Sequence, residues 1–306
     1  MKNYHNPVLL KESIEGLDIN PVGVYVDVTF GGGGHSRAIL NKLSSKGKLF
    51  AFDQDHSTSI NSIDDSRFKL ISANFSNLKK HLNLYDVSEI SGLIADFGVS
   101  SYQLDKKERG FSIRLNGPLD MRMDHKNKLN AKEIVNSYNE KKLTSLFKGY
   151  GEVSRARIYS KMIVKSRRKN KIISTKDLQN VLEPIIPKQK LNKEMAKIFQ
   201  AIRIEVNKEL DAIKVLLLQT PSFIVKGGRL VCISYHSLED RLVKNFIRHG
   251  SFDGNVNGDL YGNKFFPYKK IGDLITPSEK ELFDNKRSRS AKLRIAERIW
   301  EEFYQY

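Results

Sequence analysis

The fold is decided by one stretch, Asp27-Val28-Thr29-Phe30-Gly31-Gly32-Gly33-Gly34-His35-Ser36, which contains four consecutive glycines. It follows the alternating apolar run Val24 to Val28 and precedes an amphipathic segment, an order that predicts a strand, a glycine turn and a helix. Glycines cost backbone entropy, so a chain keeps several where φ must be positive or where a ligand touches the main chain. The stretch therefore predicts either a nucleotide-like ligand or a tight turn without one.

A carboxylate favours the nucleotide. Asp53 follows the next apolar run, Lys48 to Phe52, about 20 residues after the glycines, where a ribose-binding acid belongs; an acid after a strand also fits a helix N-cap. The dinucleotide pattern G-x-G-x-x-G fails because its third glycine would fall on Ser36 or Arg37. No Gly-Lys-Ser/Thr follows either, which excludes a P-loop. The residues favour a cofactor with an adenosine and a small charged tail, such as S-adenosylmethionine.

Composition excludes several classes of protein. The 306 residues, 40% of them hydrophobic, can form one large core and a second unit. Charged residues interrupt the N-terminal segment and no apolar run is long enough for a membrane span, so we expect neither secretion nor a membrane partner. One cysteine and seven scattered histidines predict a reducing compartment, the cytoplasm, and no metal site.

The positive charge is concentrated in one segment. The net charge is +17, and residues 105–209 hold 26 Lys and Arg against 12 Asp and Glu, a net of +14. The other 201 residues carry 26 basic and 23 acidic side chains, a net of +3. A general lysine bias of the genome would spread through the whole chain. The basic segment instead predicts a polyanionic partner, of which nucleic acid is the leading candidate.

The order of expected elements makes this basic segment an insertion in an α/β fold. Strand-like and helix-like runs alternate up to Asp96, long polar helices follow, and strand texture returns at Arg229 to Ser234 after the turn Gly227-Gly228. We predict a doubly wound core from residues 1–104 and 208–306 and an all-helical domain from residues 105–207. The expected strands are Val24–Val28, Lys48–Phe52, Phe68–Ser72, Gly92–Asp96, Arg229–Ser234 and an edge strand at Lys292–Ile299. The expected helices are Ser36–Leu43, Ser57–Ile63, Asn77–Leu84, Ala131–Asn136, Ser154–Arg168, Thr175–Leu182, Asn192–Val206 and Glu209–Gln219.

Polar motifs follow the ends of several predicted strands. In an open α/β sheet, ligands bind outside the carboxyl ends of the strands, where Asp53, Phe75 and Asp96 are expected. Phe75 fits a ring beside an adenine and an ordinary core aromatic equally well. The segments 108–112, 117–124 and 234–241 are candidates to line a substrate cleft. His236 and Ser237 do not favour nucleophilic hydrolysis, because adjacent strand side chains point to opposite sides and no G-x-S-x-G surrounds them. Ser237 is instead expected to cap a helix, with Asp240 at its third position.

Six motifs in this order resemble the bacterial small-subunit rRNA methyltransferase H family, also called MraW. They are His5-Asn6-Pro7-Val8-Leu9-Leu10, the glycine stretch, Asp96-Phe97-Gly98-Val99-Ser100-Ser101, Glu108-Arg109-Gly110-Phe111-Ser112, Gly117-Pro118-Leu119-Asp120-Met121-Arg122-Met123-Asp124 and Ser234-Tyr235-His236-Ser237-Leu238-Glu239-Asp240-Arg241. The resemblance implies S-adenosylmethionine-dependent methylation of N4, the exocyclic amine, of a decoding-region cytidine in 16S rRNA. It also implies a class I, Rossmann-like methyltransferase core.

The resemblance implies cofactor contacts from seven residues: Gly33, Gly34, His35, Asp53, Phe75, Asp96 and Gln103. The chain departs from the family at Gly32, where relatives often carry Arg, and at Tyr102, where many carry Pro. Asp96 is the candidate catalytic residue, and whether it orients the base, the cofactor or both is open. Methylation of a ring carbon would need a cysteine nucleophile, and Cys232 lies inside an apolar strand.

The substrate implied is 16S rRNA or an assembled small-subunit particle, from which the target base must leave its stack. The candidate RNA-binding residues of the insertion are Lys165, Arg167, Arg168, Lys169 and Lys171. A rival basic patch consists of Arg287, Arg289, Lys292 and Arg294. Two alternatives stay open: a binding protein that has lost catalysis, and a methyltransferase for DNA or another RNA.

Overall fold

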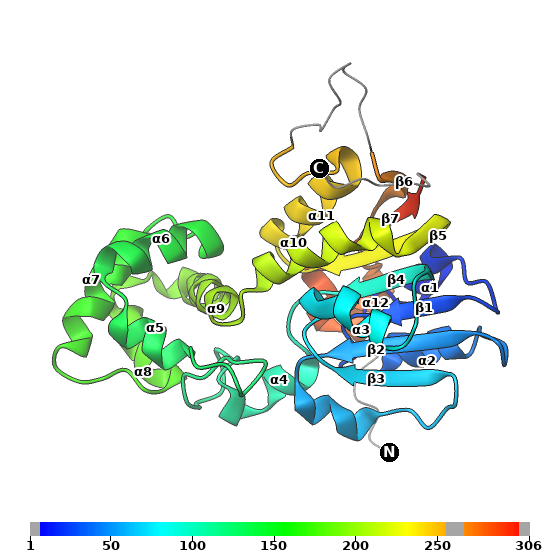
Figure 1. Cartoon of the computed structure of the whole chain (residues 1–306). Coiled ribbons are helices and arrows are strands. Elements are labelled where there is room, and N and C mark those ends of the chain that lie inside the picture. The colour runs from blue at the N-terminus through cyan, green and yellow to red at the C-terminus, as the bar shows by residue number, and fades with distance from the viewer. Residues whose placement is uncertain (1–6, 255–265, 300–306) are drawn as a thin grey trace. The chain divides into compact units, whose positions relative to one another are not determined.

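The computed structural model describes residues 7–254 and 266–299, so the motif residues His5 and Asn6 lie outside the described residues. The chain divides into two compact units, a sheet unit of residues 1–98 and 210–306 and a helical unit of residues 99–209 (Figure 1). These boundaries lie a few residues from the predicted positions 104/105 and 207/208, because the short helix α4 (Ser101–Asp105) and Glu209 belong to the helical unit.

A mixed sheet with the strand order β3-β2-β1-β4-β5-β7-β6 forms the centre of the sheet unit in the described part of the chain. Its strands are β1 Val24–Asp27, β2 Lys48–Asp53, β3 Phe68–Ser72, β4 Ile90–Asp96, β5 Ile224–Ser234, β6 Tyr268–Ile275 and β7 Lys292–Arg298. The first five are parallel, and β7 is antiparallel to both of its neighbours. The order reverses beside β1, where Asp27 pairs with Ala51 of β2 and with Ile94 of β4. Ligands of open α/β sheets bind at such a switch point.

Two predictions about the end of the sheet are wrong. The strand at Lys292 is internal, since β7 pairs with β5 and with β6, and β6 is the edge. The predicted turn Gly227-Gly228 lies inside β5, where the pairing with β4 shifts register between Ile90 and Gly92. Gly227 has a φ of 81°, as expected of a strand irregularity that needs glycine.

Helices cover both faces of the sheet because successive strand residues point to opposite sides. Val26, Phe52 and Leu93 pack into one core, together with residues of α3, α10 and α11. Tyr25, Leu49 and Ile94, each an odd number of positions away along its strand, pack into a second core with residues of α1 and α2. The helices of this unit are α1 Leu10–Leu17, α2 Gly34–Leu40, α3 Leu78–Leu84, α10 Glu209–Gln219, α11 Ser237–His249 and α12 Glu279–Asp284.

The predicted helix Ser57–Ile63 is instead a short 3-10 helix, η1 (His56–Asn61). Its serine and threonine side chains bond to nearby backbone groups, as in Thr58 Oγ1 to the Asp55 carbonyl at 2.8 Å, and such local bonds compete with a regular α-helix. Further 3-10 turns of the sheet unit are η2 Phe75–Asn77, η6 Thr220–Ser222 and η7 Lys286–Ser290.

The helical unit has a hydrophobic core of its own, in which Leu143 and Phe147 pack with Ile198 and Ile202. Its helices are α4, α5 Ala131–Ser137, α6 Glu140–Gly151, α7 Ala156–Arg167, α8 Thr175–Leu182 and α9 Leu191–Asn207, with 3-10 turns η3 Lys107–Arg109, η4 Glu183–Ile185 and η5 Lys188–Lys190. The prediction missed α6. Within residues 99–209, all of which the structure describes, β pairing is limited to one bridge between Pro118 and Ser174. In the described ranges, no helix combines the length and apolar character that crossing a membrane requires.

Candidate functional site

The glycine stretch turns the chain from β1 into α2. Gly31 and Gly33 have φ values of 50° and 74°, and Gly33 is the residue that precedes the helix. A Cβ at Gly33 would lie 2.9 Å from the ring of Phe30 and 2.7 Å from Nη1 of Arg37, so both backbone angle and space require glycine there. A Cβ at Gly34 would collide with Pro7. The helix begins two residues before the predicted Ser36, and its first N–H groups have no partner within the helix.

Asp27 holds this turn in place and was not among the predicted site residues. Its Oδ1 accepts the backbone N–H of Thr29 at 3.0 Å, and its Oδ2 accepts the hydroxyl of Ser36 at 2.7 Å. Burial raises the pKa of Asp27 above its usual value, while the nearby His35 opposes that shift. The sequence did contain a signal for Asp27, since it is a carboxylate inside the apolar run Val24 to Val28. A charged group in a buried strand needs polar partners, which indicates a structural or binding role.

Asp53 joins the end of β2 to the glycine turn. Its Oδ2 accepts the N–H of Gly31 at 2.9 Å, and its Oδ1 accepts the N–H of Asp55 at 2.8 Å. Loss of hydration raises the pKa of Asp53 to about 7, although these two N–H donors oppose the shift. Each carboxylate oxygen has a second lone pair, so Asp53 retains the capacity to accept two further hydrogen bonds.

Asp96 joins the end of β4 to the same turn. Its backbone N–H donates to Thr29 Oγ1 at 2.7 Å, and its Oδ1 accepts the hydroxyl of Tyr235 at 2.8 Å. Burial raises the pKa of Asp96 to about 6, and His35 and the Tyr235 hydroxyl oppose this shift. A carboxyl group with such a pKa is still mostly ionised at neutral pH.

Residues that follow β3 contact residues next to Asp53 and Asp96. Asn74 Nδ2 donates to Gln54 Oε1 at 2.6 Å, beside Asp53 in sequence. The partly buried ring of Phe75 meets Phe97 edge to face, with centroids 6.0 Å apart, and borders the core on one side. The predicted residues Phe75, Asp53, the glycine turn and Asp96 therefore follow the carboxyl ends of β3, β2, β1 and β4, which are adjacent in the sheet. The imidazole of His35 is buried, with Nε2 3.2 Å from the Val8 carbonyl oxygen.

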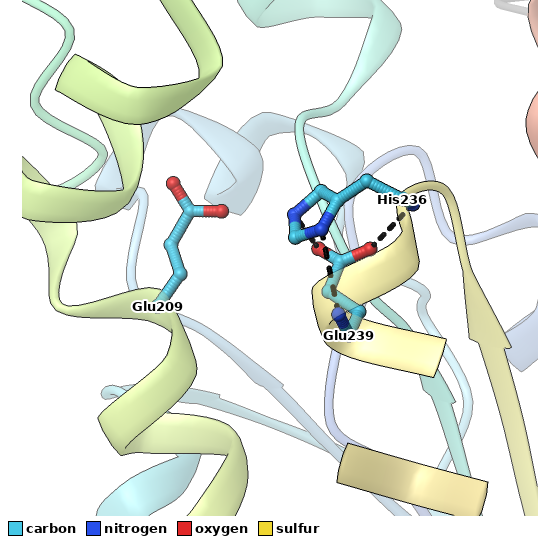
Figure 2. A group of neighbouring side chains, drawn as sticks. All are labelled: Glu209, His236 and Glu239. Carbon is cyan, nitrogen blue, oxygen red and sulfur yellow. Dashed lines mark hydrogen bonds and ion pairs between the residues drawn. The ribbon is translucent and has the colours of Figure 1, made fainter. Parts of the chain in front are cut away.

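The cap of α11 differs from the prediction. His236, not Ser237, is the N-cap: its Nδ1 accepts the N–H of Glu239 at 3.4 Å. The buried Glu239 carboxylate accepts the N–H of Tyr235 at 2.8 Å. Its other oxygen lies 3.1 Å from His236 Nε2 (Figure 2). Figure 2 also draws Glu209, which belongs to the helical unit and forms a salt bridge with Arg203 at 2.9 Å.

Asp240, predicted at the third helix position, is paired with basic side chains instead. It lies 2.7 Å from Arg294 Nε and 3.5 Å from Lys292 Nζ. Two members of the rival basic patch are thus engaged within the sheet unit, while Arg289 is exposed.

Gln103 and the predicted loops 108–112 and 117–124 belong to the helical unit. Gln103 forms a capping box with Ser100, accepting the Ser100 N–H at 3.0 Å through its side chain. In the loops, Arg109 Nη2 donates to the carbonyls of Arg122 and Met123, at 2.9 and 3.1 Å. A Cβ at Gly117 would collide with the backbone of Lys107. These motif residues hold the two loops together.

Most of the candidate RNA-binding residues lie on the surface of the helical unit. Lys165, Arg168, Lys169 and Lys171 are exposed at the end of α7 and just after it. Arg167 differs because its Nη1 donates to the Val135 carbonyl at 2.6 Å and its burial lowers its pKa. Arg167 thus bonds within the unit.

Comparison with known proteins decides the family, because the model of the MraW methylase family matches residues 2–299. The chain belongs to the MraW methylase family. Two relatives, from Christiangramia forsetii and Cytophaga hutchinsonii, are both named Ribosomal RNA small subunit methyltransferase H. The first is 51% identical over 98% of this chain and 99% of its own length, and the second is 53% identical over 96% and 99%.

Membership of the MraW methylase family makes the protein a methyltransferase, and the predicted family and fold class are confirmed. Among solved structures, Aeropyrum pernix fibrillarin, crystallised with natively bound S-adenosyl-L-methionine, aligns with a TM-score of 0.38 and 8% identity. That alignment covers 94% of this chain and 73% of the fibrillarin chain.

Proposed function

We propose that the protein transfers a methyl group from S-adenosylmethionine to N4 of a cytidine in the decoding region of 16S rRNA. One observation carries the proposal: an aromatic ring, two carboxylates and a glycine turn lie at the ends of the adjacent strands β3, β2, β1 and β4 in a member of the MraW methylase family. The relatives named Ribosomal RNA small subunit methyltransferase H support the class of substrate.

The donor set of the sheet unit fits S-adenosylmethionine. Asp53 has free lone pairs for ribose hydroxyls, and the backbone N–H groups of Gly34 and His35 lie at the turn. The N–H of Gly33 already donates to the Phe30 carbonyl at 2.7 Å, so Gly33 serves the site through its positive φ and the close approach that it allows. Phe75, at the end of β3, supplies a ring edge or face for the adenine. Asp96 completes this set in the sheet unit, and Gln103 is assigned to it by family resemblance. When bound, the cofactor supplies an electrophilic methyl group on a sulfonium.

The acceptor nitrogen requires positioning because its lone pair is delocalised into the cytosine ring. A carboxylate that accepts a hydrogen bond from the exocyclic N–H fixes the orientation of the amine. It also stabilises the positive charge that develops on the nitrogen as the new N–C bond forms. Asp96 is suited to this role: its pKa of about 6 leaves it ionised at neutral pH, and its backbone is fixed by Thr29.

Methylation of a ring carbon has no support in this chain. That reaction needs a thiolate that adds to the base. Cys232 is the only cysteine of the sequence, it is 1% exposed within β5, and burial raises its pKa to about 12. A thiol in this state is neither ionised nor accessible, which favours nitrogen as the acceptor atom.

The helical unit supplies the groups for RNA. It carries almost all of the chain's excess positive charge, and Lys165, Arg168, Lys169 and Lys171 are exposed near the end of one helix. Such side chains bind phosphates without reading the sequence. In the proposed function this unit grips 16S rRNA, either free or within a partly assembled small subunit.

The test is methylation of small-subunit RNA taken from cells that lack the gene. Purified protein, labelled S-adenosylmethionine and either free 16S rRNA or intact subunits are incubated, and the modified nucleotide is located by mass mapping. We expect one N4-methylated cytidine in the decoding region. A methyl group on a ring carbon, or on DNA or another RNA only, would refute the proposal. Failure to bind S-adenosylmethionine in calorimetry would instead indicate a binding protein without catalysis.

A further inference from the structure

Tyr235 lies directly after β5 and contacts the candidate catalytic carboxylate. Its hydroxyl donates to Asp96 Oδ1 at 2.8 Å, although 139 positions separate the two residues in sequence. Among the described residues, no group donates to the other oxygen, Oδ2. One oxygen of Asp96 is therefore held by the protein, and the second is left to a ligand.

The position of Tyr235 is itself fixed from two sides. Its backbone N–H donates to Glu239 Oε2 at 2.8 Å, which ties it to the first turn of α11. Its ring lies over Gly98, where a Cβ would be 3.4 Å from Cδ2, and Gly98 has a φ of 108°. The positive φ would strain a larger residue at position 98, so the backbone against which the ring packs is itself fixed. The surroundings thus place the hydroxyl at one point, as a positioning group requires.

We propose that Tyr235 is a positioning residue for methyl transfer, whose hydroxyl holds Oδ1 of Asp96 so that Oδ2 faces the exocyclic amine of the acceptor base. The inference rests on the proposed function. Tyr235 does not touch the reacting atoms. It acts through Asp96, by fixing the carboxylate plane and by stabilising its ionised form.

Removal of the hydroxyl has a defined electrostatic effect. Burial, Asp27 of β1 and Glu239 of α11 favour the protonated form of Asp96, whereas His35 of α2 and the Tyr235 hydroxyl favour the ionised form. Without the hydroxyl, the carboxylate loses its only side-chain hydrogen bond among the described residues. Since a hydrogen bond to a charged group is worth more than a neutral one, the pKa of Asp96 should rise by roughly one unit.

The experiment compares pH–rate profiles of the wild type and Tyr235→Phe in single-turnover methylation of the same rRNA substrate. We expect the acidic limb, where the rate falls as Asp96 is protonated, to move up by roughly one pH unit. At neutral pH protonation of Asp96 alone lowers the rate only about twofold. Loss of the positioning contact should bring the total decrease to roughly tenfold, with the dissociation constant of S-adenosylhomocysteine changed less than about twofold. An acidic limb at the wild-type position overturns the inference.

Tyr25→Phe is the matched control. It also removes a tyrosine hydroxyl bonded within the sheet unit, since Tyr25 accepts the N–H of Asn20 at 2.8 Å, but it does not contact Asp96. Its acidic limb should coincide with that of the wild type. An equal displacement in this control would show a general effect of lost stability and would overturn the positioning role.

A second variant applies if Tyr235→Phe does not fold. Incorporation of 3-fluorotyrosine at position 235 keeps the hydroxyl and strengthens it as a donor, so the acidic limb should move down in pH. Burial and the neighbouring carboxylates raise the pKa of Tyr235 well above 10, which keeps the fluorinated phenol protonated. A wild type that fails to methylate rRNA refutes the proposed function. Methylation by the wild type with no displacement in the fluorotyrosine variant refutes this inference alone.

Discussion

Asp53→Asn should separate stability from cofactor binding, because the carboxylate of Asp53 is costly to bury and useful to a ligand. Its pKa rises from 3.8 to about 7 in the folded protein, chiefly through burial. At about 1.4 kcal/mol per unit, the ionised form is disfavoured by about 4 kcal/mol, and partial exposure reduces this to roughly 2–4 kcal/mol. A raised pKa gives stability that is present below pH 4 and lost as the pH rises through 7.

Asparagine has no such ionisation, but its NH2 group must face one of the N–H groups of Gly31 and Asp55. One hydrogen bond is lost and one donor is left unpaired, at a cost of roughly 1–3 kcal/mol. Relative to the wild type, the variant should therefore be less stable near pH 5 and about equally stable near pH 8. Because part of the effect is already lost between pH 4 and 5, the difference between their free energies of unfolding should change by roughly 1–3 kcal/mol over this range.

The loss of cofactor affinity in Asp53→Asn should have the opposite pH dependence from the loss of stability: it should be largest near pH 8 and smallest near pH 5. The ionised carboxylate accepts ribose hydroxyls through charge-assisted bonds, so the variant should bind S-adenosylhomocysteine roughly 10–100-fold more weakly near pH 8. Protonation of Asp53 weakens the wild type as the pH falls below 7, so the ratio of the two affinities should approach one near pH 5. The ligand's own amino group titrates equally in both titrations and cancels in this ratio.

Urea unfolding without ligand and isothermal titration calorimetry measure the two effects at each pH. Asp65→Asn is the control: Asp65 pairs with Arg67 at 2.6 Å, and its pKa is lowered to about 2. Its contribution to stability is present above pH 4 and is lost as the pH falls toward 2, so its loss should be constant between pH 5 and 8. An affinity ratio independent of pH, or a stability difference that Asp65→Asn reproduces, contradicts the assigned role of Asp53.

Three further predictions follow from the geometry. Gly33→Ala should cost roughly 2–4 kcal/mol of stability, from a positive φ and contact with Phe30, and thermal unfolding measures it; a loss under about 1 kcal/mol is inconsistent with the described turn. Gly117→Ala should unfold the loop that Lys107 contacts, seen as faster amide exchange over residues 107–124, whereas unchanged exchange contradicts the close approach. Reversal to Glu of Lys165, Arg168, Lys169 and Lys171 should weaken rRNA binding at least tenfold in a filter assay and leave S-adenosylhomocysteine affinity unchanged; equal RNA binding would exclude this surface.

The central strands were predictable because they are buried on both faces. Runs such as Leu49 to Phe52 and Leu230 to Ile233 are continuously apolar, which distinguishes a parallel internal strand from the amphipathic helices around it. The edge strand β6 has most of its residues at least partly exposed and includes Lys269, Lys270 and Asp273, so it carries no apolar pattern. Without β6, β7 was placed at the edge. The register shift in β5 was missed because paired glycines are typical of turns and of strand irregularities alike.

The predicted cofactor residues of the sheet unit were found because parallel strands end at one edge, so sequence order alone brings their following residues together. Partners across long sequence distances had no such signal. Tyr235 meets Asp96 only because β5 returns beside β4 after the whole helical unit. The N-cap at His236 was missed because serine is the commoner cap, while Nδ1 of an imidazole accepts the same N–H.

In the proposed function, the two partners carry opposite charges, and the chain separates its own charges accordingly. S-adenosylmethionine bears a sulfonium cation, and three carboxylates with raised pKa values lie at neighbouring strand ends, the buried Asp27 and the half-buried Asp53 and Asp96. RNA is a polyanion, and the excess of Lys and Arg lies in residues 105–209. Buried acids cost stability, so each is held by N–H or O–H donors. A cation among them would lower all three pKa values, and cofactor binding near neutral pH should therefore release protons. Calorimetry in buffers of different ionisation enthalpy measures that release, which Asp53→Asn should reduce.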